Sequence, residues 1–368
     1  MQNINFSELW KNIDWRKTQK IVFRLQVRLW KAMRASDSVR VRNLQNLILR
    51  SRSARLIAIR QVTQLNAGKK TAGVDGQKSL NYQQRFELEE RLAKHAFNWK
   101  HSKLREIPIP KKDGSLRILK VPTIADRAWQ CLIKLALEPA HEATFHERSY
   151  GFRQGRSTHD CQKMIFNNLR SLSHGITKRV LELDIQKCFD QICHKALIRR
   201  VIAPARIKQR IWQCLKAGAS VEFPDIGTPQ GGVFSPILAN IALNGIERIH
   251  QSVRYADDLV FILKPKDNAE SIRSQIDEFL AQRGLKVKER KTRLVHSTDG
   301  FDFLGWHFKV QQNGKFRSTP SEENFLAFRQ KVKEIVNSSN YGAIVKAKKL
   351  APIVRGWRKH SKWRIATA

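Results

Sequence analysis

Acidic residues are scarce in this chain of 368 residues. It carries 32 Asp and Glu against 69 Lys and Arg, which leaves a formal net charge of +37. The positive electrostatic field of such a chain repels basic partners and attracts polyanions. The excess is spread over residues 40–60, 286–293 and 355–362, so it predicts a long basic track that suits an extended nucleic acid. The alternative, a set of solvated helix faces, needs far less charge.

Cysteine and long apolar runs are also scarce. Five Cys without regular spacing argue against a disulfide framework and predict buried packing thiols. No apolar run approaches the roughly 18 residues that span a bilayer, and the first residues lack the apolar core of a signal peptide. We therefore expect a cytoplasmic protein with no membrane partner. The 41% of hydrophobic residues and nine Trp can still form one or two sizeable cores.

The first half of the chain alternates helical and strand patterns. Apolar residues at steps of three and four predict basic amphipathic helices over residues 15–65, and Gly-rich residues 66–76 predict a loop. Residues 105–122 predict a hairpin around Lys112-Asp113-Gly114. A helix from about residue 124 is expected to end at Pro139. Residues 179–185 then predict a buried strand that carries Asp184 close to its end.

The second half contains another hairpin. Helices are predicted over about residues 194–217 and 235–248, and residues 252–255 and 259–263 then flank Ala256-Asp257-Asp258 as strands flank a turn. A helix over about 269–282, closed by Gly284, precedes strand-like segments at 285–287, 292–296 and 301–308. Thr319-Pro320-Ser321-Glu322 predicts a capping box with Pro320 at the first helical position. A two-helix unit follows, its second helix over about 344–360.

Three carboxylates in this order suggest a metal-dependent enzyme. Asp257 and Asp258 are adjacent at a hairpin turn, and Asp184 follows a separate buried strand. Magnesium prefers oxygen ligands, and in nucleotidyl transfer two ions serve the attacking 3′-oxygen and the pyrophosphate leaving group. A lone carboxylate on an apolar strand costs several kcal/mol, so a cation is expected at Asp184 and Asp257. Asp258 could instead serve structurally.

The motifs around these residues resemble the reverse transcriptases of bacterial group II introns. Tyr255-Ala256-Asp257-Asp258 and the segment around Asp184 are similar to the family's two metal-binding motifs. Further similar blocks occur in the family's order, and they cover nearly the whole chain. They are residues 25–76 (N-terminal extension), 105–127 (fingers hairpin), 150–157, 228–240 (nucleotide-facing loop and helix), 303–306 and 350–357 (thumb or maturase region).

The resemblance implies a role for each matched residue. Asp184, Asp257 and Asp258 would be catalytic and would hold two Mg²⁺ ions, with the backbone carbonyl of Ile185 as a further ligand. The residues implied to bind the incoming dNTP are Lys111, Arg117, Phe189, Gln230 and Lys291, and those implied to support the primer end are Phe303, Leu304, Gly305 and Trp306. Judged by residue type alone, Phe189 fits an ordinary core position, and Lys111, Arg117 and Lys291 fit solvated charges.

The implied fold is α+β, a right-hand polymerase with three parts. These are a helical N-terminal extension (residues 1–80), fingers and palm (81–315) and a helical thumb or maturase region (316–368). The implied activity is RNA-directed DNA synthesis, with a maturase role in splicing and retrohoming. The implied partners are group II intron RNA, a DNA target and primer, and dNTPs. The sequence identifies no protein partner.

Two departures and two rival interpretations remain. The connection between residues 248 and 255 is shorter than in relatives, and no endonuclease motif follows the thumb region, so we expect no target cleavage by this chain. A splicing factor that has lost polymerisation is one alternative, although the three intact Asp residues argue against it. A reverse transcriptase domesticated for phage defence or beside CRISPR genes is the other.

Overall fold

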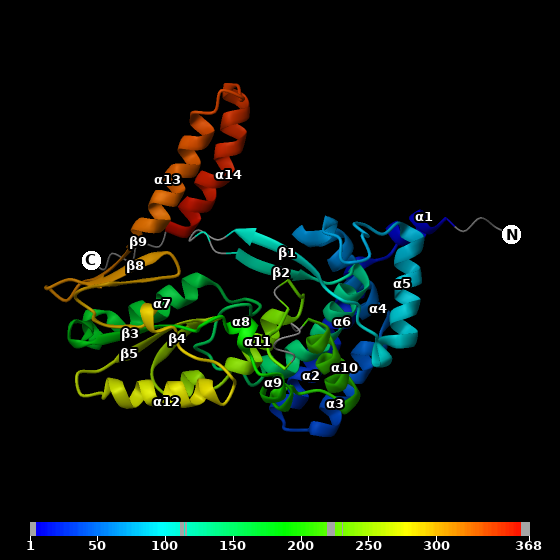
Figure 1. Cartoon of the computed structure of the whole chain (residues 1–368), viewed down its shortest axis with the longest axis horizontal. Coiled ribbons are helices and arrows are strands. Elements are labelled where there is room, and N and C mark those ends of the chain that lie inside the picture. The colour runs from blue at the N-terminus through cyan, green and yellow to red at the C-terminus, as the bar shows by residue number, and fades with distance from the viewer. Residues whose placement is uncertain (1–4, 111–113, 115, 219–224, 230, 362–368) are drawn as a thin grey trace. The chain divides into compact units, whose positions relative to one another are not determined.

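A computed structural model describes residues 5–110, 114, 116–218, 225–229 and 231–361 of the chain (Figure 1). Contacts divide the chain into two units. Unit 1 combines Met1–Phe145, Gln186–Asn244 and Leu280–Leu285, and unit 2 combines His146–Ile185, Gly245–Phe279 and Lys286–Ala368. Each unit therefore gathers segments that are far apart in the sequence. The three-part division at residues 80 and 315 stays a prediction.

Unit 1 begins with five α-helices, of which the second to the fourth are the amphipathic helices predicted over residues 15–65. They are α1 (Phe6–Lys11), α2 (Trp15–Arg34), α3 (Ser38–Arg50), α4 (Arg52–Arg60) and α5 (Tyr82–His95). Their apolar stripes are buried and include Leu29, Ile48 and Ile59. The loop predicted at residues 66–76 is present after a short 3₁₀ turn. Arg127 fixes it by donating to the carbonyls of Gly68 and Thr71.

The long helix α6 (Ile124–Glu142) corrects one expectation, because Pro139 lies inside it and does not end it. A proline lacks the N–H that would bond the carbonyl four residues earlier. That carbonyl, on Leu135, instead accepts a hydrogen bond from Gln26 Nε2 at 3.1 Å. A side chain of α2 therefore supplies the missing donor, and the helix continues for one more turn.

The remaining elements of unit 1 follow the sequence pattern. The predicted hairpin is confirmed as antiparallel β1 (Arg105–Pro110) and β2 (Leu116–Val121). Four further helices are α8 (Cys188–Gln191), α9 (His194–Arg200), α10 (Ala205–Gly218) and α11 (Ser235–Leu243). The last of these ends earlier than residue 248, because Gly245 takes a left-handed backbone angle of +106° before a 3₁₀ turn.

Unit 2 is built on two antiparallel sheets. The larger has the order β4-β5-β3-β6 and comprises β4 (Ser252–Tyr255), β5 (Asp258–Leu263), β3 (Arg179–Asp184) and β6 (Arg293–His296). The smaller contains β7 (Phe301–Phe303), β8 (Trp306–Val310) and β9 (Phe316–Pro320). Side chains of both sheets and of α7 (Thr158–Leu169) share one core that includes Val180, Val260 and Phe308.

The strand-like segments predicted at residues 285–287, 292–296 and 301–308 differ in structure. Residues 285–287 form a single bridge, Val287 with Ile185, and no strand. The segment 301–308 is a hairpin with a turn at Leu304 and Gly305. Residues 292–296 form β6 as expected, and the helix predicted at 269–282 is α12 (Ala269–Ala281).

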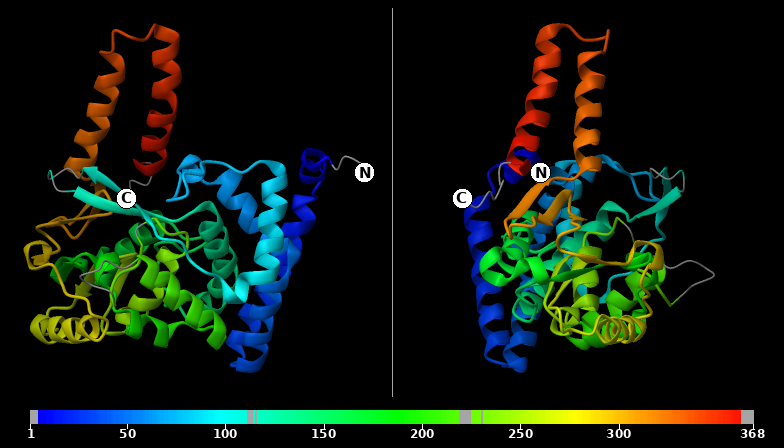
Figure 2. Two further views of the ribbon diagram at one scale, coloured as in Figure 1. Left: turned by 45° about the vertical axis from the view of Figure 1, so that its right-hand side comes forward. Right: turned by 90° about the vertical axis from the view of Figure 1, so that its left-hand side faces the viewer.

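The last two helices are α13 (Glu322–Val336) and α14 (Ala343–Ser361). They run side by side in every view and extend away from the small sheet of unit 2 (Figure 2). The predicted capping box was wrong by two residues. Pro320 is the last residue of β9, paired with Trp306, and Ser321 caps α13 by accepting from the Asn324 N–H. No helix within the described ranges is long and apolar enough to cross a membrane.

Candidate active site

Asp184 and Asp258 face each other across two neighbouring strands. Asp184 ends β3, Asp258 begins β5, and the two are partners in the antiparallel register. Directly paired residues point to the same face of a sheet, with Cβ atoms about 5 Å apart. Asp257 lies next to them in the two-residue turn that joins β4 to β5. The two metal motifs predicted from the sequence therefore meet at one end of the larger sheet.

Desolvation and mutual repulsion make these carboxylates a candidate cation site. Atoms packed around the Asp258 carboxylate raise its pKa to about 6, and the charges of Asp257 and Asp184 add to the rise. A divalent cation would relieve this repulsion, and carboxylate oxygens are the ligands that Mg²⁺ prefers. The donor set fits the ion, although no three His, Cys, Asp or Glu side chains in the described parts are already arranged as a metal site.

Lys291 occupies the edge of the same cluster. Its Nζ lies 3.2 Å from Asp184 Oδ2, and its side chain remains 63% exposed. The backbone supports this approach, because the N–H of Lys288 donates to the Asp184 carbonyl at 2.8 Å. A cavity of about 400 Å³ opens beside Asp184, Asp258 and Lys291. An exposed ammonium beside this cavity is free to contact an anionic group bound there.

The predicted primer-support residues form the tip of the β7–β8 hairpin. Leu304 and Gly305 have positive φ angles of 52° and 84°, which is the geometry of a tight hairpin turn. The Gly305 carbonyl accepts from the Ser321 N–H and from Asn324 Nδ2. Trp306 stacks on His360 of α14 with ring centres 4.0 Å apart. The tip is therefore held by the start of α13 and the end of α14.

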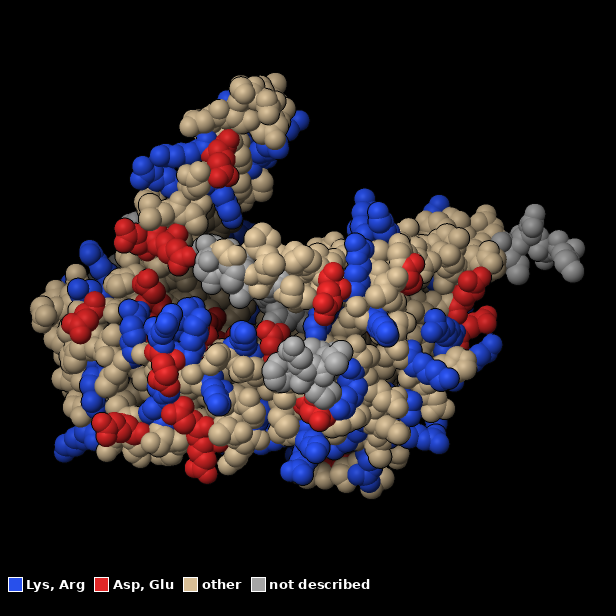
Figure 3. Space-filling model, in the orientation of Figure 1, with Lys and Arg blue, Asp and Glu red and all other residues tan. Residues whose placement is uncertain are grey.

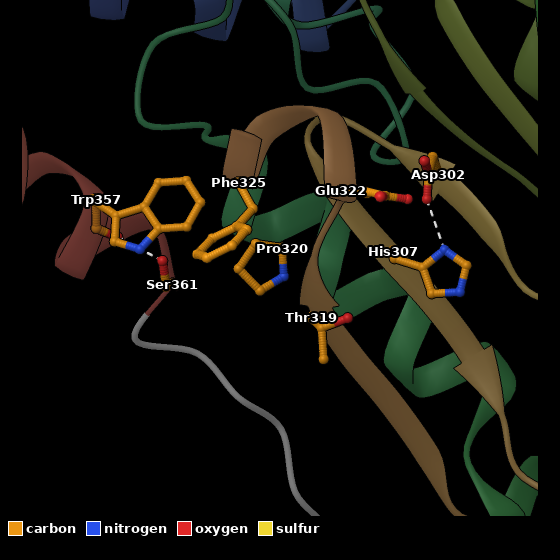
Figure 4. A pocket seen from close by; sticks show the side chains of 8 residues that line it. All are labelled: Asp302, His307, Thr319, Pro320, Glu322, Phe325, Trp357 and Ser361. Carbon is orange, nitrogen blue, oxygen red and sulfur yellow. Dashed lines mark hydrogen bonds and ion pairs between the residues drawn. The ribbon is translucent and has the colours of Figure 1, made fainter. Parts of the chain in front are cut away.

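A second cavity, of about 730 Å³, lies at the base of α13 and α14. Phe325 and Trp357 line one side, and the Asp302–His307 pair lines another (Figure 4). His307 Nδ1 is 2.7 Å from Asp302 Oδ1. Asp302 also lines the cavity beside Asp184. The two cavities of unit 2 therefore share the carboxylate of Asp302, which lies on the β7–β8 hairpin.

Three of the remaining predicted site residues lie in described segments of the backbone. Phe189 lies on α8, half-buried, and its carbonyl accepts from the Thr228 N–H at 2.6 Å. Arg117 is in β2, but its side chain is outside the description, and Lys111 and Gln230 lie outside the described residues. Ile185 is buried and bridged to Val287 in unit 2. The roles of these five residues stay predictions.

Sequence reasoning missed a buried ion pair behind the aspartate turn. Arg254 Nε lies 2.5 Å from Glu247 Oε1, and neither side chain is exposed. The signal was present, because Arg254 is a charged residue inside an otherwise apolar strand and directly precedes Tyr255. Gly151 was noted only as part of a motif, yet a Cβ atom at this position would lie 2.3 Å from the Ala256 nitrogen.

Basic side chains are distributed over the visible face of the molecule (Figure 3). Figure 3 shows Lys and Arg scattered over one face, with acidic groups between them. Arg55 is an exception within the basic stretch 40–60, because it is buried and lies 2.7 Å from Glu89. The remaining positive surface suits a polyanionic partner.

Comparison with known proteins agrees with this geometry. Residues 109–308 match the family described as reverse transcriptase (RNA-dependent DNA polymerase), and residues 10–92 match the N-terminal domain of reverse transcriptase. The chain is 42% identical to Maturase-like protein 1 of Euglena gracilis, over 96% of this chain and 78% of that protein. It is 29% identical to protein YkfC of Escherichia coli, over 80% of this chain and 90% of that protein.

A third relative is the group II intron-encoded protein LtrA of Lactococcus lactis, 27% identical over 58% of this chain and 48% of LtrA. The family match covers β3, β5 and the turn before β5, which together carry the three aspartates, and it covers the β1–β2 hairpin from residue 109 onward. The chain therefore belongs to the reverse transcriptase family of RNA-dependent DNA polymerases.

Proposed function

We propose that this reverse transcriptase copies RNA into DNA at Asp184, Asp257 and Asp258 with two Mg²⁺ ions. The family generally uses divalent metal ions. The observation that supports the site is the register of Asp184 opposite Asp258, in a cluster where desolvation and then the charges of Asp257 and Asp184 raise the pKa of Asp258. Bound ions would activate the attacking 3′-oxygen and stabilise the pyrophosphate. The protein's share is to hold the carboxylates in place.

In this proposal Lys291 leaves Asp184 when ions bind and contacts the pyrophosphate. Its long exposed side chain allows that movement without change to the buried sheet. Lys111 and Arg117 of the fingers hairpin, Phe189 and Gln230 would position the dNTP. The tip at Phe303, Leu304, Gly305 and Trp306 would support the primer end.

Primer extension tests the proposal. Purified protein, a DNA primer on an RNA template, dNTPs and Mg²⁺ should yield DNA, and EDTA should abolish the product. Removal of a group that hydrogen-bonds to a metal ligand typically lowers activity roughly 10–100-fold. Asp257→Ala removes a proposed ligand itself, so its rate of DNA synthesis should fall by more. Asp277→Asn on α12, which removes a surface carboxylate paired with Arg273, is the matched control and should retain activity. Equal synthesis by Asp257→Ala would refute the site.

We further propose that the chain binds the RNA of a group II intron and assists its splicing, with retrohoming into a DNA target as the outcome. Support comes from the basic surface and from relatives named as maturase-like and group II intron-encoded proteins. Splicing of the intron by wild type and by Asp257→Ala separates the two roles. Full splicing without DNA synthesis in the variant would mean that they are independent. Splicing by a wild type that makes no DNA would favour a splicing factor without polymerase activity.

A further inference from the structure

The turn that carries Asp257 has an unfavourable backbone. Ala256, its first residue, has a φ of +58°, in the left-handed region where glycine is the usual residue. Such a residue costs about 1–3 kcal/mol and persists only where its surroundings enforce it. The groups that enforce it therefore also fix the backbone from which Asp257 and Asp258 project.

Arg254 is the side chain that reaches this turn from inside the protein. Its Nη1 donates to the Ala256 carbonyl at 3.0 Å, and its Nη2 donates to Ser149 Oγ at 2.6 Å. Its Nε donates to Glu247 Oε1 at 2.5 Å. The planar guanidinium thus joins three separate segments in one fixed geometry, which the flexible point charge of a lysine cannot reproduce.

The partners of Arg254 are themselves fixed. Glu247 Oε2 accepts from the Gly245 N–H at 3.1 Å, and the Glu247 carbonyl accepts from Arg148 Nη2 at 2.6 Å. The backbone of Arg254 is held on its other side, because its N–H donates to Arg148 and its carbonyl accepts from Tyr150. Residues 148–151 therefore lie along β4 and end against the turn.

A fully buried ion pair is weak evidence for stability, since the desolvation of both charges offsets their attraction. A role in geometry accounts better for this pair, because Arg254 bonds the carbonyl of the strained residue next to Asp257. We propose that Arg254, oriented by Glu247 and Ser149, is a positioning residue that sets the place of Asp257 and Asp258 for metal binding. The proposal rests on the proposed function of the aspartate site.

The test removes both charges together. Arg254→Met with Glu247→Leu leaves no unpaired buried charge, so the fold should survive. Primer extension should show a kcat lower by about 10–100-fold and a half-saturating Mg²⁺ concentration raised by a similar factor, the range typical of groups that orient metal ligands. The KM for dNTP and the affinity for primed template should stay within about twofold, because no residue that binds them changes.

A second readout needs no metal. Hydrogen exchange of metal-free protein should show amides of residues 252–258 exchanging at least about tenfold faster in the double variant, because local opening of the turn becomes easier. The matched control is Arg55→Met with Glu89→Leu, which removes a largely buried ion pair of unit 1 and should alter neither the Mg²⁺ requirement nor exchange at the turn.

The outcomes separate this inference from the proposed function. If Asp257→Ala is inactive while the double variant keeps the wild-type Mg²⁺ requirement and exchange rates, the positioning role alone is overturned. Weaker template binding or earlier unfolding with an unchanged Mg²⁺ requirement overturns it as well. Should the double variant unfold, Arg254→Lys decides, and a folded lysine variant with wild-type Mg²⁺ dependence refutes the role. Undiminished synthesis by Asp257→Ala would refute the proposed site itself.

Discussion

Substitution of Gly151 by alanine should disable the aspartate turn without touching an aspartate. A Cβ atom at residue 151 would lie 2.3 Å from the Ala256 nitrogen and 2.9 Å from the Tyr255 carbonyl carbon. Ordinary contact begins at 3.4 Å, so one of the two backbones has to move by about 1 Å. Gly151 has no positive φ angle, so alanine fits its backbone and the whole effect arises from the lack of space.

The expected cost follows from that displacement. Misplacement of catalytic groups by about 1 Å can cost roughly 100-fold in rate, and overpacking costs about 1–3 kcal/mol of unfolding free energy. Single-turnover primer extension at saturating Mg²⁺ and dNTP measures the rate of synthesis, and urea unfolding measures the free energy of unfolding. Gly342→Ala is the control, because apart from its neighbours in the chain no atom lies within 4 Å of its added Cβ. A Gly151→Ala enzyme as fast as wild type would show that the packing does not fix the turn.

Three further outcomes are expected. The raised pKa of Asp258, about 6, means that the native state binds its proton more tightly than the unfolded state, so metal-free protein should lose stability as pH rises from about 4 through 6. Asp258→Asn should therefore unfold at a higher urea concentration than wild type at pH 8 in EDTA, and at the same concentration below pH 4. Gln26→Leu should cost about 1–3 kcal/mol by leaving the Leu135 carbonyl unpaired, and Pro139→Ala in that background should recover part of it, because the new N–H can bond that carbonyl. RNA affinity should fall steeply between about 50 and 200 mM salt, and a flat titration would mean that few of the basic groups contact phosphate.

Much of the local structure could be predicted because local rules determine it. The apolar run before Asp184 and the strand-turn-strand pattern around Asp257 fix two strands and one turn. The two helices at the end follow from the same periodicity. What the pattern could not supply is the register that sets Asp184 opposite Asp258, since strands far apart in the chain pair through contacts that leave no local signal.

The errors in the prediction share a tertiary cause. Pro139 stays inside α6 because Gln26, on another helix, bonds the Leu135 carbonyl. The Thr319 capping box is displaced because pairing with β8 keeps Pro320 in a strand. Arg254 was overlooked because the sequence shows only a single charge in an apolar strand. Its contacts with Glu247 and the Ala256 carbonyl arise in the tertiary structure.

The two last helices contrast with the rest of unit 2. Both lie wholly within the described part of the chain, and no residue of α13 or α14 is buried. Their own association includes the stack of Phe328 on Trp357, with ring centres 4.4 Å apart. Helices with so little burial are marginal by themselves. Proteases should therefore cut the α13–α14 pair before any other helix of unit 2, and a ligand that shields the pair should slow the cleavage. The pair would then be rigid only in its complex with that ligand.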